Sequence, residues 1–167
     1  MMVIGVDPGG TTGIFFLNIF HKEIEGRGAI QVGSAAGIDS RREVVMTTLR
    51  ILISDSEETN IYVAVEEFVR GPRSGRLRSP QDSQLAIDII GAIRAMPEIN
   101  RARRPVTAYF HSAATVKRWA TTQRLEAAGL IAPTIGEPHA RDAARHALFL
   151  AVKTGMVPDP LSRKAAR

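Results

Sequence analysis

Cysteine is absent from this chain of 167 residues. Its absence excludes disulfide bonds, zinc sites built on thiolates and cysteine nucleophiles. The sequence also lacks any apolar run near the ~20 residues that a membrane-spanning helix needs. It has no basic-then-apolar leader of the kind that directs export. We therefore expect a cytoplasmic protein that does not associate with membranes.

Positive charge is in excess, with 22 Lys and Arg against 17 Asp and Glu and a formal net charge of +5. The excess is mostly arginine, and it is clustered in three segments: 70–78, 101–104 and 163–167. The first segment is also rich in Gly, Pro and Ser, which predicts a long loop. Clustered basic residues indicate a polyanionic partner, with nucleic acid the best candidate. The alternative is a soluble surface that is merely basic.

Apolar runs separated by turn residues predict a mixed α/β chain. Strands are expected over 2–7, 12–19, 28–33, 61–68 and 106–110, and helices over 40–53, 82–96, 112–128 and 138–154. Three strands followed by alternating strands and helices predict a five-stranded mixed sheet, made of a three-strand meander plus parallel strands, with helices on both faces. We expect a single domain over 1–160 and a basic tail over 161–167.

The expected helix 82–96 is apolar on more than one side. One side carries Leu85 and Ile89, whereas Ile87 and Ile90 are expected to point outward from another side. A helix of this kind is buried on more than one side. The second side can meet the core of the same chain or a second subunit, and we expect a homodimer through it.

Two acidic residues stand at the ends of expected strands. Asp7 ends the first strand before a Pro-Gly-Gly turn, and Glu66 lies near the end of the strand 61–68. If these strands are parallel neighbours, the two carboxylates lie side by side and raise each other's pKa unless a cation sits between them. Mg²⁺ prefers such oxygen ligands. The alternative is that Asp7 only accepts hydrogen bonds in its turn. Glu67 points to the other sheet face by alternation and is the second choice.

The expected last helix carries further polar residues near its start. His139, Asp142 and His146 are spaced i, i+3 and i+7, which places them on one helix face among alanines. Small neighbours permit this helix to pack close to the first strand. The alternative is that Asp142 interacts with the helix dipole and that both histidines lie on a solvated face.

Four segments taken in order resemble a known family. They are 5–13 (GVDPGGTTG), 64–67 (AVEE), 84–92 (QLAIDIIGA) and 139–143 (HARDA). Together they are similar to the motifs of RuvC-type Holliday junction resolvases, which are endonucleases of the RNase H-like superfamily. The resemblance spans most of the chain.

The resemblance implies a divalent-metal-dependent endonuclease that cleaves phosphodiester bonds in branched DNA. It implies a catalytic and metal-binding set of Asp7, Glu66, His139 and Asp142, and two Mg²⁺ or Mn²⁺ ions. Many relatives carry Asp where this chain has His139. An alternative pair of Asp142 with His146 stays open. If His139 completes the site, His146 lies a turn deeper and is expected to be dispensable.

The expected DNA contacts are Phe68, Arg70, Arg73, Arg76, Arg78, Lys117 and Arg118. The basic residues would hold phosphates without reading bases. Phe68 would wedge into a junction, or would simply be a core aromatic at the end of a strand. Two other functions remain open. One is a flap or RNase H-like nuclease of broader specificity on the same fold. The other is a nucleotide-binding domain of the actin/hexokinase type, although that class normally needs two domains.

Overall fold

A five-stranded sheet forms the centre of the computed structural model, which describes residues 1–33, 38–68, 79–96 and 106–162. The strand order is β3-β2-β1-β4-β5. The strands are β1 (Met2–Asp7), β2 (Thr12–Phe20), β3 (Glu23–Val32), β4 (Ile61–Glu67) and β5 (Val106–Ser112). β1, β2 and β3 pair as an antiparallel meander, and β4 and β5 continue the sheet parallel to β1. The predicted mixed sheet is therefore confirmed.

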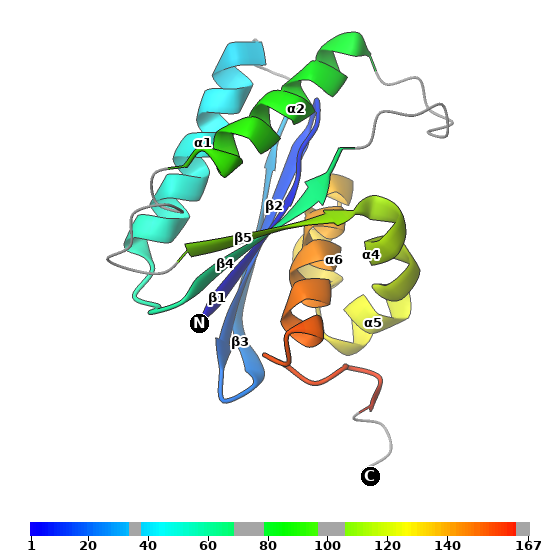
Figure 1. Cartoon of the computed structure of the whole chain (residues 1–167). Coiled ribbons are helices and arrows are strands. Elements are labelled where there is room, and N and C mark those ends of the chain that lie inside the picture. Colours follow the sequence, from blue (N-terminus) through cyan, green and yellow to red (C-terminus); the bar gives the residue numbers. More distant parts are fainter. Residues whose placement is uncertain (34–37, 69–78, 97–105, 163–167) are drawn as a thin grey trace.

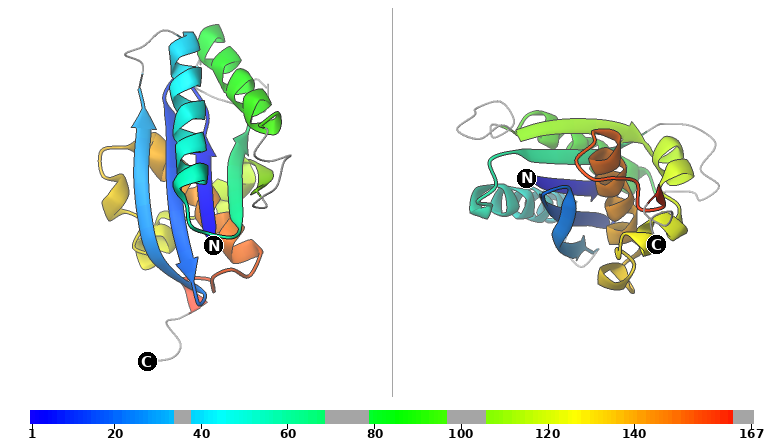
Figure 2. Two further views of the ribbon diagram at one scale, coloured as in Figure 1. Left: turned by 90° about the vertical axis from the view of Figure 1, so that its left-hand side faces the viewer. Right: turned by 90° about the horizontal axis from the view of Figure 1, so that it is seen from below.

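Helices cover both faces of this sheet (Figures 1 and 2). α1 (Ile38–Asp55) and α2 (Pro80–Arg94) lie on one face. α6 (Pro138–Lys153) crosses the other face, with the short helices α4 (Ala113–Trp119) and α5 (Thr122–Ala127) beside it. Among the described residues no helix has the length and apolar character needed to cross a bilayer.

The core under α1 and α2 is built from large aliphatic side chains. Leu49 of α1 and Ile89 of α2 are almost completely buried against Ile4 and Val6 of β1. Both helices present these residues at helical spacing, and the strand presents alternate residues to them. Burying side chains of this size supplies most of the favourable free energy of folding.

The core under α6 contains large side chains such as Phe15 and Leu148, but the part of the helix that crosses β1 is lined by small residues. Ala143 and Ala147 of α6 are fully buried, and they lie against Gly5 of β1. A Cβ atom built on Gly5 would overlap the carbonyl oxygen of Ala143 and would lie 2.8 Å from its carbonyl carbon. The backbones of the helix and the strand therefore approach much more closely on this face than side chains of ordinary size would permit.

Several expected boundaries are wrong. β3 begins at Glu23 rather than at residue 28. The helix expected over 112–128 is two helices, because Ala120 ends α4 and the side chain of Thr121 caps α5 by accepting from the Arg124 amide. A short 3₁₀ helix at Ala132–Thr134 was not expected.

The expectation that Ile90 points outward from α2 is also wrong. Ile90 is 6% exposed and belongs to the aliphatic core shared with α1, whereas Ile87 is partly exposed. The second apolar side of α2 is thus largely covered within the chain itself.

Candidate active site

The carboxylates of Asp7 and Glu66 lie at the ends of neighbouring parallel strands. The register pairs Val6 of β1 with Val65 of β4, which places the next residue of each strand at the same edge. Asp7 is 4% exposed and Glu66 is 7% exposed. By alternation both share the sheet face that α6 covers, together with Gly5.

Asp7 is held by a histidine from α6. The Nδ1 atom of His139 lies 2.9 Å from Oδ2 of Asp7. Burial raises the pKa of Asp7, and the nearby charges of Glu66 and Asp142 raise it further, although the hydrogen bond with His139 works in the opposite direction. The net upward shift means that ionised Asp7 lacks sufficient positive charge around it.

The start of α6 lies close to the sheet because Gly13 of β2 has no side chain at the point where the two meet. A Cβ atom on Gly13 of β2 would overlap the backbone of His139 and would lie 2.5 Å from the amide nitrogen of Ala140. Gln31 of β3 also anchors this helix end, since its Oε1 accepts from the His139 amide at 3.2 Å. The first turn of α6 is thereby fixed beside Asp7.

Asp142 lies one turn along α6 and contacts two cations. Nζ of Lys117 is 2.7 Å from its Oδ2, and Nε of Arg145 is 3.3 Å from its Oδ1. Burial lowers the pKa of Lys117, but the hydrogen bond and charge of Asp142 and the charges of Glu66 and Asp7 outweigh it, so that the pKa is raised. The ammonium group of Lys117 thus lies in the combined field of three carboxylates.

Glu66 contacts the second histidine of α6. Nε2 of His146 lies 3.3 Å from Oε2 of Glu66, and the ring is fully buried. The imidazole of His111, from β5, lies 6.5 Å from that of His146 between ring centres. Burial lowers the pKa of His111, and the neighbouring His146 adds to the effect.

The sequence left open which histidine joins Asp142, and the two histidines lie at different carboxylates. His139 contacts Asp7, whereas His146 contacts Glu66. Asp142 itself contacts Lys117 and Arg145. Neither histidine contacts Asp142, so which of them completes the site stays a prediction.

The donor set suits a divalent cation, although it is not assembled around one point. In the described part of the chain, no three Asp, Glu or His side chains converge closely enough to form a metal cluster. Each carboxylate instead contacts a side chain of the protein: Asp7 contacts His139, Glu66 contacts His146, and Asp142 contacts Lys117 and Arg145. Three carboxylates match the ligand preference of Mg²⁺ and Mn²⁺, and an imidazole is a nitrogen ligand that Mn²⁺ accepts more readily than Mg²⁺ does. The Lys117 ammonium shows that positive charge is already stabilised there.

Glu67 takes no part in this group. Its side chain is 47% exposed, and its Oε1 lies 3.6 Å from Nη2 of Arg94 on α2. It therefore faces the layer opposite to α6, as the alternation along the strand indicates.

The expected DNA contacts have different positions. Four of them, Arg70, Arg73, Arg76 and Arg78, lie outside the described residues. Arg118 is exposed on α4, and Lys117 on the same helix reaches the carboxylates. Phe68 is partly buried and packs against the aliphatic core, which agrees with its interpretation as a core aromatic at a strand end.

Arg41, which sequence reasoning did not find, braces the turn after Asp7. Its Nη1 donates to the carbonyl of Gly10 at 2.7 Å and lies 3.9 Å from Oδ1 of Asp82 at the start of α2. Arg41 lies on α1, far from the motif in sequence. The sequence offers no signal for this contact, nor for the one between Gln31 and α6.

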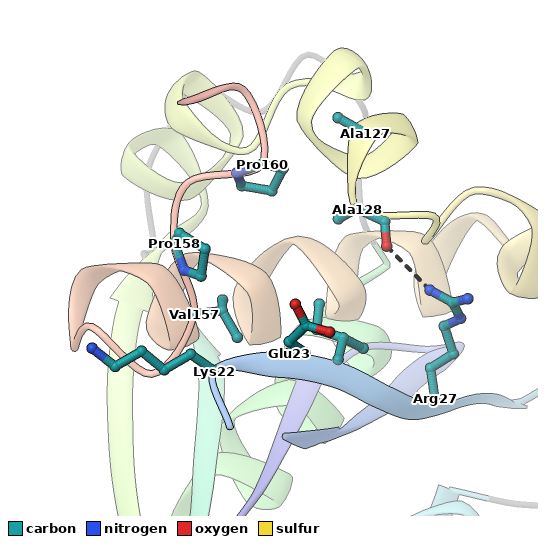
Figure 3. A pocket seen from close by; sticks show the side chains of 9 residues that line it. Lys22, Glu23, Arg27, Ala127, Ala128, Val157, Pro158 and Pro160 are labelled. Carbon is teal, nitrogen blue, oxygen red and sulfur yellow. Dashed lines mark hydrogen bonds between the residues drawn. The ribbon is translucent and has the colours of Figure 1, made fainter. Parts of the chain in front are cut away.

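A small pocket lies at the opposite end of the sheet and is unrelated to these carboxylates. Its volume is about 150 Å³, and it lies between the β2–β3 hairpin, α5 and the segment after α6 (Figure 3). Within it Arg27 donates to the carbonyl of Ala128 at 3.1 Å. No cluster of acidic side chains lines it, so the strand edge at Asp7 remains the candidate active site.

Comparison with solved structures identifies the fold. The chain is similar to Thermus thermophilus RuvC in complex with a Holliday junction substrate, with 16% identity, 93% of this chain and 97% of that chain covered, and a TM-score of 0.58. A second Thermus thermophilus RuvC structure gives 17% identity, coverage of 93% and 98%, and a TM-score of 0.53. The yeast mitochondrial Holliday junction resolvase Ydc2 gives 14% identity, coverage of 98% and 74%, and a TM-score of 0.45.

The sequence matches no protein-family model, and no curated protein sequence matches it significantly. The structural likeness nevertheless extends over nearly the whole length of both chains. The chain therefore has the RNase H-like fold. Within that fold, it has the arrangement seen in RuvC.

Proposed function

We propose that this protein is a divalent-metal-dependent endonuclease that cleaves branched DNA, with four-way junctions as its principal substrate. One observation carries the proposal: the Lys117 ammonium contacts the carboxylate of Asp142 on α6 and also lies in the field of the carboxylates of Asp7 on β1 and Glu66 on β4. The RuvC fold supports it, because one of the similar structures is RuvC bound to a Holliday junction substrate. The net charge of +5 suits a polyanionic substrate.

Asp7, Glu66 and Asp142 would hold the metal ions, and His139 would ligate or position the attacking water. When bound, two Mg²⁺ or Mn²⁺ ions would supply Lewis-acid activation of water and stabilisation of the leaving oxygen. The protein orients this set by fixing Asp7 with His139. Lys117 would compete with a divalent ion for Asp142. When the ion is bound, we expect the Lys117 ammonium to release that carboxylate and to contact the phosphate backbone of DNA instead.

The test is cleavage of labelled synthetic DNA with Mg²⁺, Mn²⁺ or a chelator. The substrates are a four-way junction, a flap, an RNA–DNA hybrid and a single strand. We expect junction cleavage that requires metal. Equal cleavage of all branched or hybrid substrates would indicate a nuclease of broader specificity on the same fold. ATP binding without any cleavage would favour the nucleotide-binding alternative.

Carboxylate variants connect this activity to the site. Asp7→Asn and Glu66→Gln should abolish cleavage while leaving junction binding within a few fold. Glu67→Gln is the matched control, because it removes a neighbouring carboxylate that faces the other layer. Near-native cleavage by either of the first two variants would contradict the metal assignment.

We also propose a homodimer, since paired cuts on opposed strands need two sites at a fixed separation. Ile87 is a large apolar residue that is partly exposed on α2, the helix that the sequence favoured as the interface. Ile87→Glu should give monomers by light scattering, because a lone charge is costly to bury. A wild-type monomer at micromolar concentration would contradict the dimer.

A further inference from the structure

The imidazole of His146 is buried where packing alone would favour an apolar side chain. It lies on α6 with no exposed surface, and the next two residues of the helix, Ala147 and Leu148, belong to the apolar core under α6. Neither ring nitrogen makes a hydrogen bond of good geometry. An unsatisfied buried polar group is destabilising, and a leucine at this position would avoid that penalty. An explanation of the imidazole must therefore lie in what its ring faces.

The ring faces the carboxylate of Glu66. Nε2 of His146 lies 3.3 Å from Oε2, just beyond the usual range of an N–H···O hydrogen bond. Glu66 stands at the end of β4 and is 7% exposed. The contact thus reaches the carboxylate from inside the protein, on the α6 side of the sheet.

The surroundings keep the imidazole in this place. α6 approaches β1 and β2 closely because Gly5 and Gly13 have no side chains. His111 of β5 pairs in register with Glu66. The centre of its ring lies 6.5 Å from that of His146, and the ring packs edge-to-face on Phe149 at 5.1 Å. Two rigid elements therefore fix His146 relative to the strand that carries Glu66.

We propose that His146 is a positioning residue that donates its Nε2–H to Oε2 of Glu66 and fixes the orientation of that carboxylate for metal binding. The inference rests on the proposed function, because the ion to be bound is the divalent cation of that site. Hydrogen bonds that orient metal-binding groups typically change metal affinity by about 10–100-fold when they are removed. This role differs from the sequence-based expectation that His146 is dispensable, and the variants below distinguish the two.

The decisive comparison is between two substitutions of similar size. His146→Leu removes the donor, whereas His146→Gln retains an N–H at the position of Nε2. We expect His146→Leu to weaken Mn²⁺ binding by about 10–100-fold, and His146→Gln to restore most of the affinity. Mn²⁺ binding to the full chain is measured by calorimetry or by electron paramagnetic resonance. Native Mn²⁺ affinity in His146→Leu would overturn the proposal, as would equal losses in both variants.

Leu148→Ala is the matched control. Leu148 is also fully buried on α6 and belongs to the apolar core. Its side chain has no hydrogen-bond donor that could serve Glu66 as Nε2 of His146 does. We expect this variant to lower thermal stability without changing Mn²⁺ affinity. A fall in Mn²⁺ affinity as large as that of His146→Leu would reduce His146 to a structural residue and overturn its positioning role.

A second measurement needs no metal. Nitrogen-15 NMR of the metal-free protein should show His146 as the Nε2–H tautomer, with a signal that moves in Glu66→Gln. The Nδ1–H tautomer would overturn the proposal even if His146→Leu fails to fold. A wild-type protein that binds no Mn²⁺ but shows the Nε2–H tautomer would contradict the proposed metal-dependent function. It would still support the hydrogen bond from His146 to Glu66.

Discussion

The two faces of the sheet are packed in different ways. Under α1 and α2 the space is filled by large aliphatic side chains such as Leu49 and Ile89, which hold the helices at ordinary distance. Under α6 the space is closed by alanines against Gly5 and Gly13, and the backbones themselves approach. Both faces bury large apolar side chains, and the second face also brings a helix backbone to the edge of the sheet.

The difference explains where the candidate active site can form. His139, Asp142 and His146 lie on the helix of the alanine-rich face, and Asp7 and Glu66 lie on strands beneath it. His139 reaches Asp7 and His146 reaches Glu66 because α6 packs so closely on the strands. Both faces contribute stability through buried apolar side chains, and the alanine-rich face also supplies positions for the polar groups. Substitutions on the two faces should therefore separate stability from metal binding.

The largest loss of stability is expected on the aliphatic face. Leu49→Ala removes a side chain that is 1% exposed and leaves a cavity next to β1. Such truncations cost about 2–5 kcal/mol. Mn²⁺ affinity of the folded fraction should not change, because Leu49 lies on the far face from the carboxylates. Chemical denaturation and calorimetry measure the two quantities. A loss of Mn²⁺ affinity would show that the faces are not separable.

Gly5→Ala should cause a smaller loss of stability than Leu49→Ala, and it should also weaken metal binding. The added methyl group overlaps the Ala143 carbonyl, and it has no rotamer that avoids the clash. Overpacking of this kind costs about 1–3 kcal/mol, and α6 must shift away from Asp7. Mn²⁺ affinity should therefore fall together with the free energy of unfolding.

Gly91→Ala is the control for that substitution. Nothing lies within 4 Å of a Cβ atom built on Gly91, which is exposed within α2. Alanine is preferred over glycine inside a helix by about 0.5–1 kcal/mol, so this variant should be more stable than the wild type. Equal destabilisation by the two alanine substitutions would contradict the close approach of α6.

The smallest effect is expected outside both layers, at the ion pair of Arg124 and Asp159. Nη2 of Arg124 lies 3.2 Å from Oδ2 of Asp159, just beyond the end of α6. Slight burial raises the pKa of Asp159, but the hydrogen bond and charge of Arg124 lower it more. Asp159→Asn should cost about 0.2–1 kcal/mol at neutral pH, as partly exposed pairs do.

The pH dependence of that pair has a defined sign. Because the folded-state pKa of Asp159 lies below its ordinary value, the stabilisation is present above the ordinary carboxyl pKa and is lost as the pH falls through the folded value. The difference in stability between wild type and Asp159→Asn should vanish in acid, while Mn²⁺ affinity at neutral pH should be equal. A difference that grows in acid would contradict the assignment.

The sequence predicts the sheet well where strands are continuously apolar. All six residues of β1 are buried, and its bounds were expected correctly. β3 was expected too short, because it is an edge strand whose first half mixes charged residues such as Glu23, Glu25 and Arg27 with apolar ones. The break between α4 and α5 was missed, although Thr121 is a typical capping residue.

The candidate site divides in the same way. Asp7 and Glu66 could be predicted as neighbours because parallel strands end at one edge. The contact of Lys117 with Asp142 and that of His146 with Glu66 could not, because both depend on how closely α6 packs on the sheet and on how α4 leaves β5. The alanines of α6 indicated a close approach but not which polar groups would meet.

The central claim is that the buried carboxylates at the ends of β1 and β4 form a cation site. The most direct test is thermal unfolding of the wild type and of Asp7→Asn, each measured once with chelator and once with Mn²⁺. The raised pKa of Asp7 means that the metal-free protein loses stability as the pH rises through the folded-state value. With chelator at neutral pH, Asp7→Asn should therefore melt higher than wild type. With Mn²⁺ at about 100 times its dissociation constant, wild type should gain about 2.7 kcal/mol, and Asp7→Asn should gain little. A variant that melts lower than wild type with chelator and gains as much from Mn²⁺ would contradict the cation site.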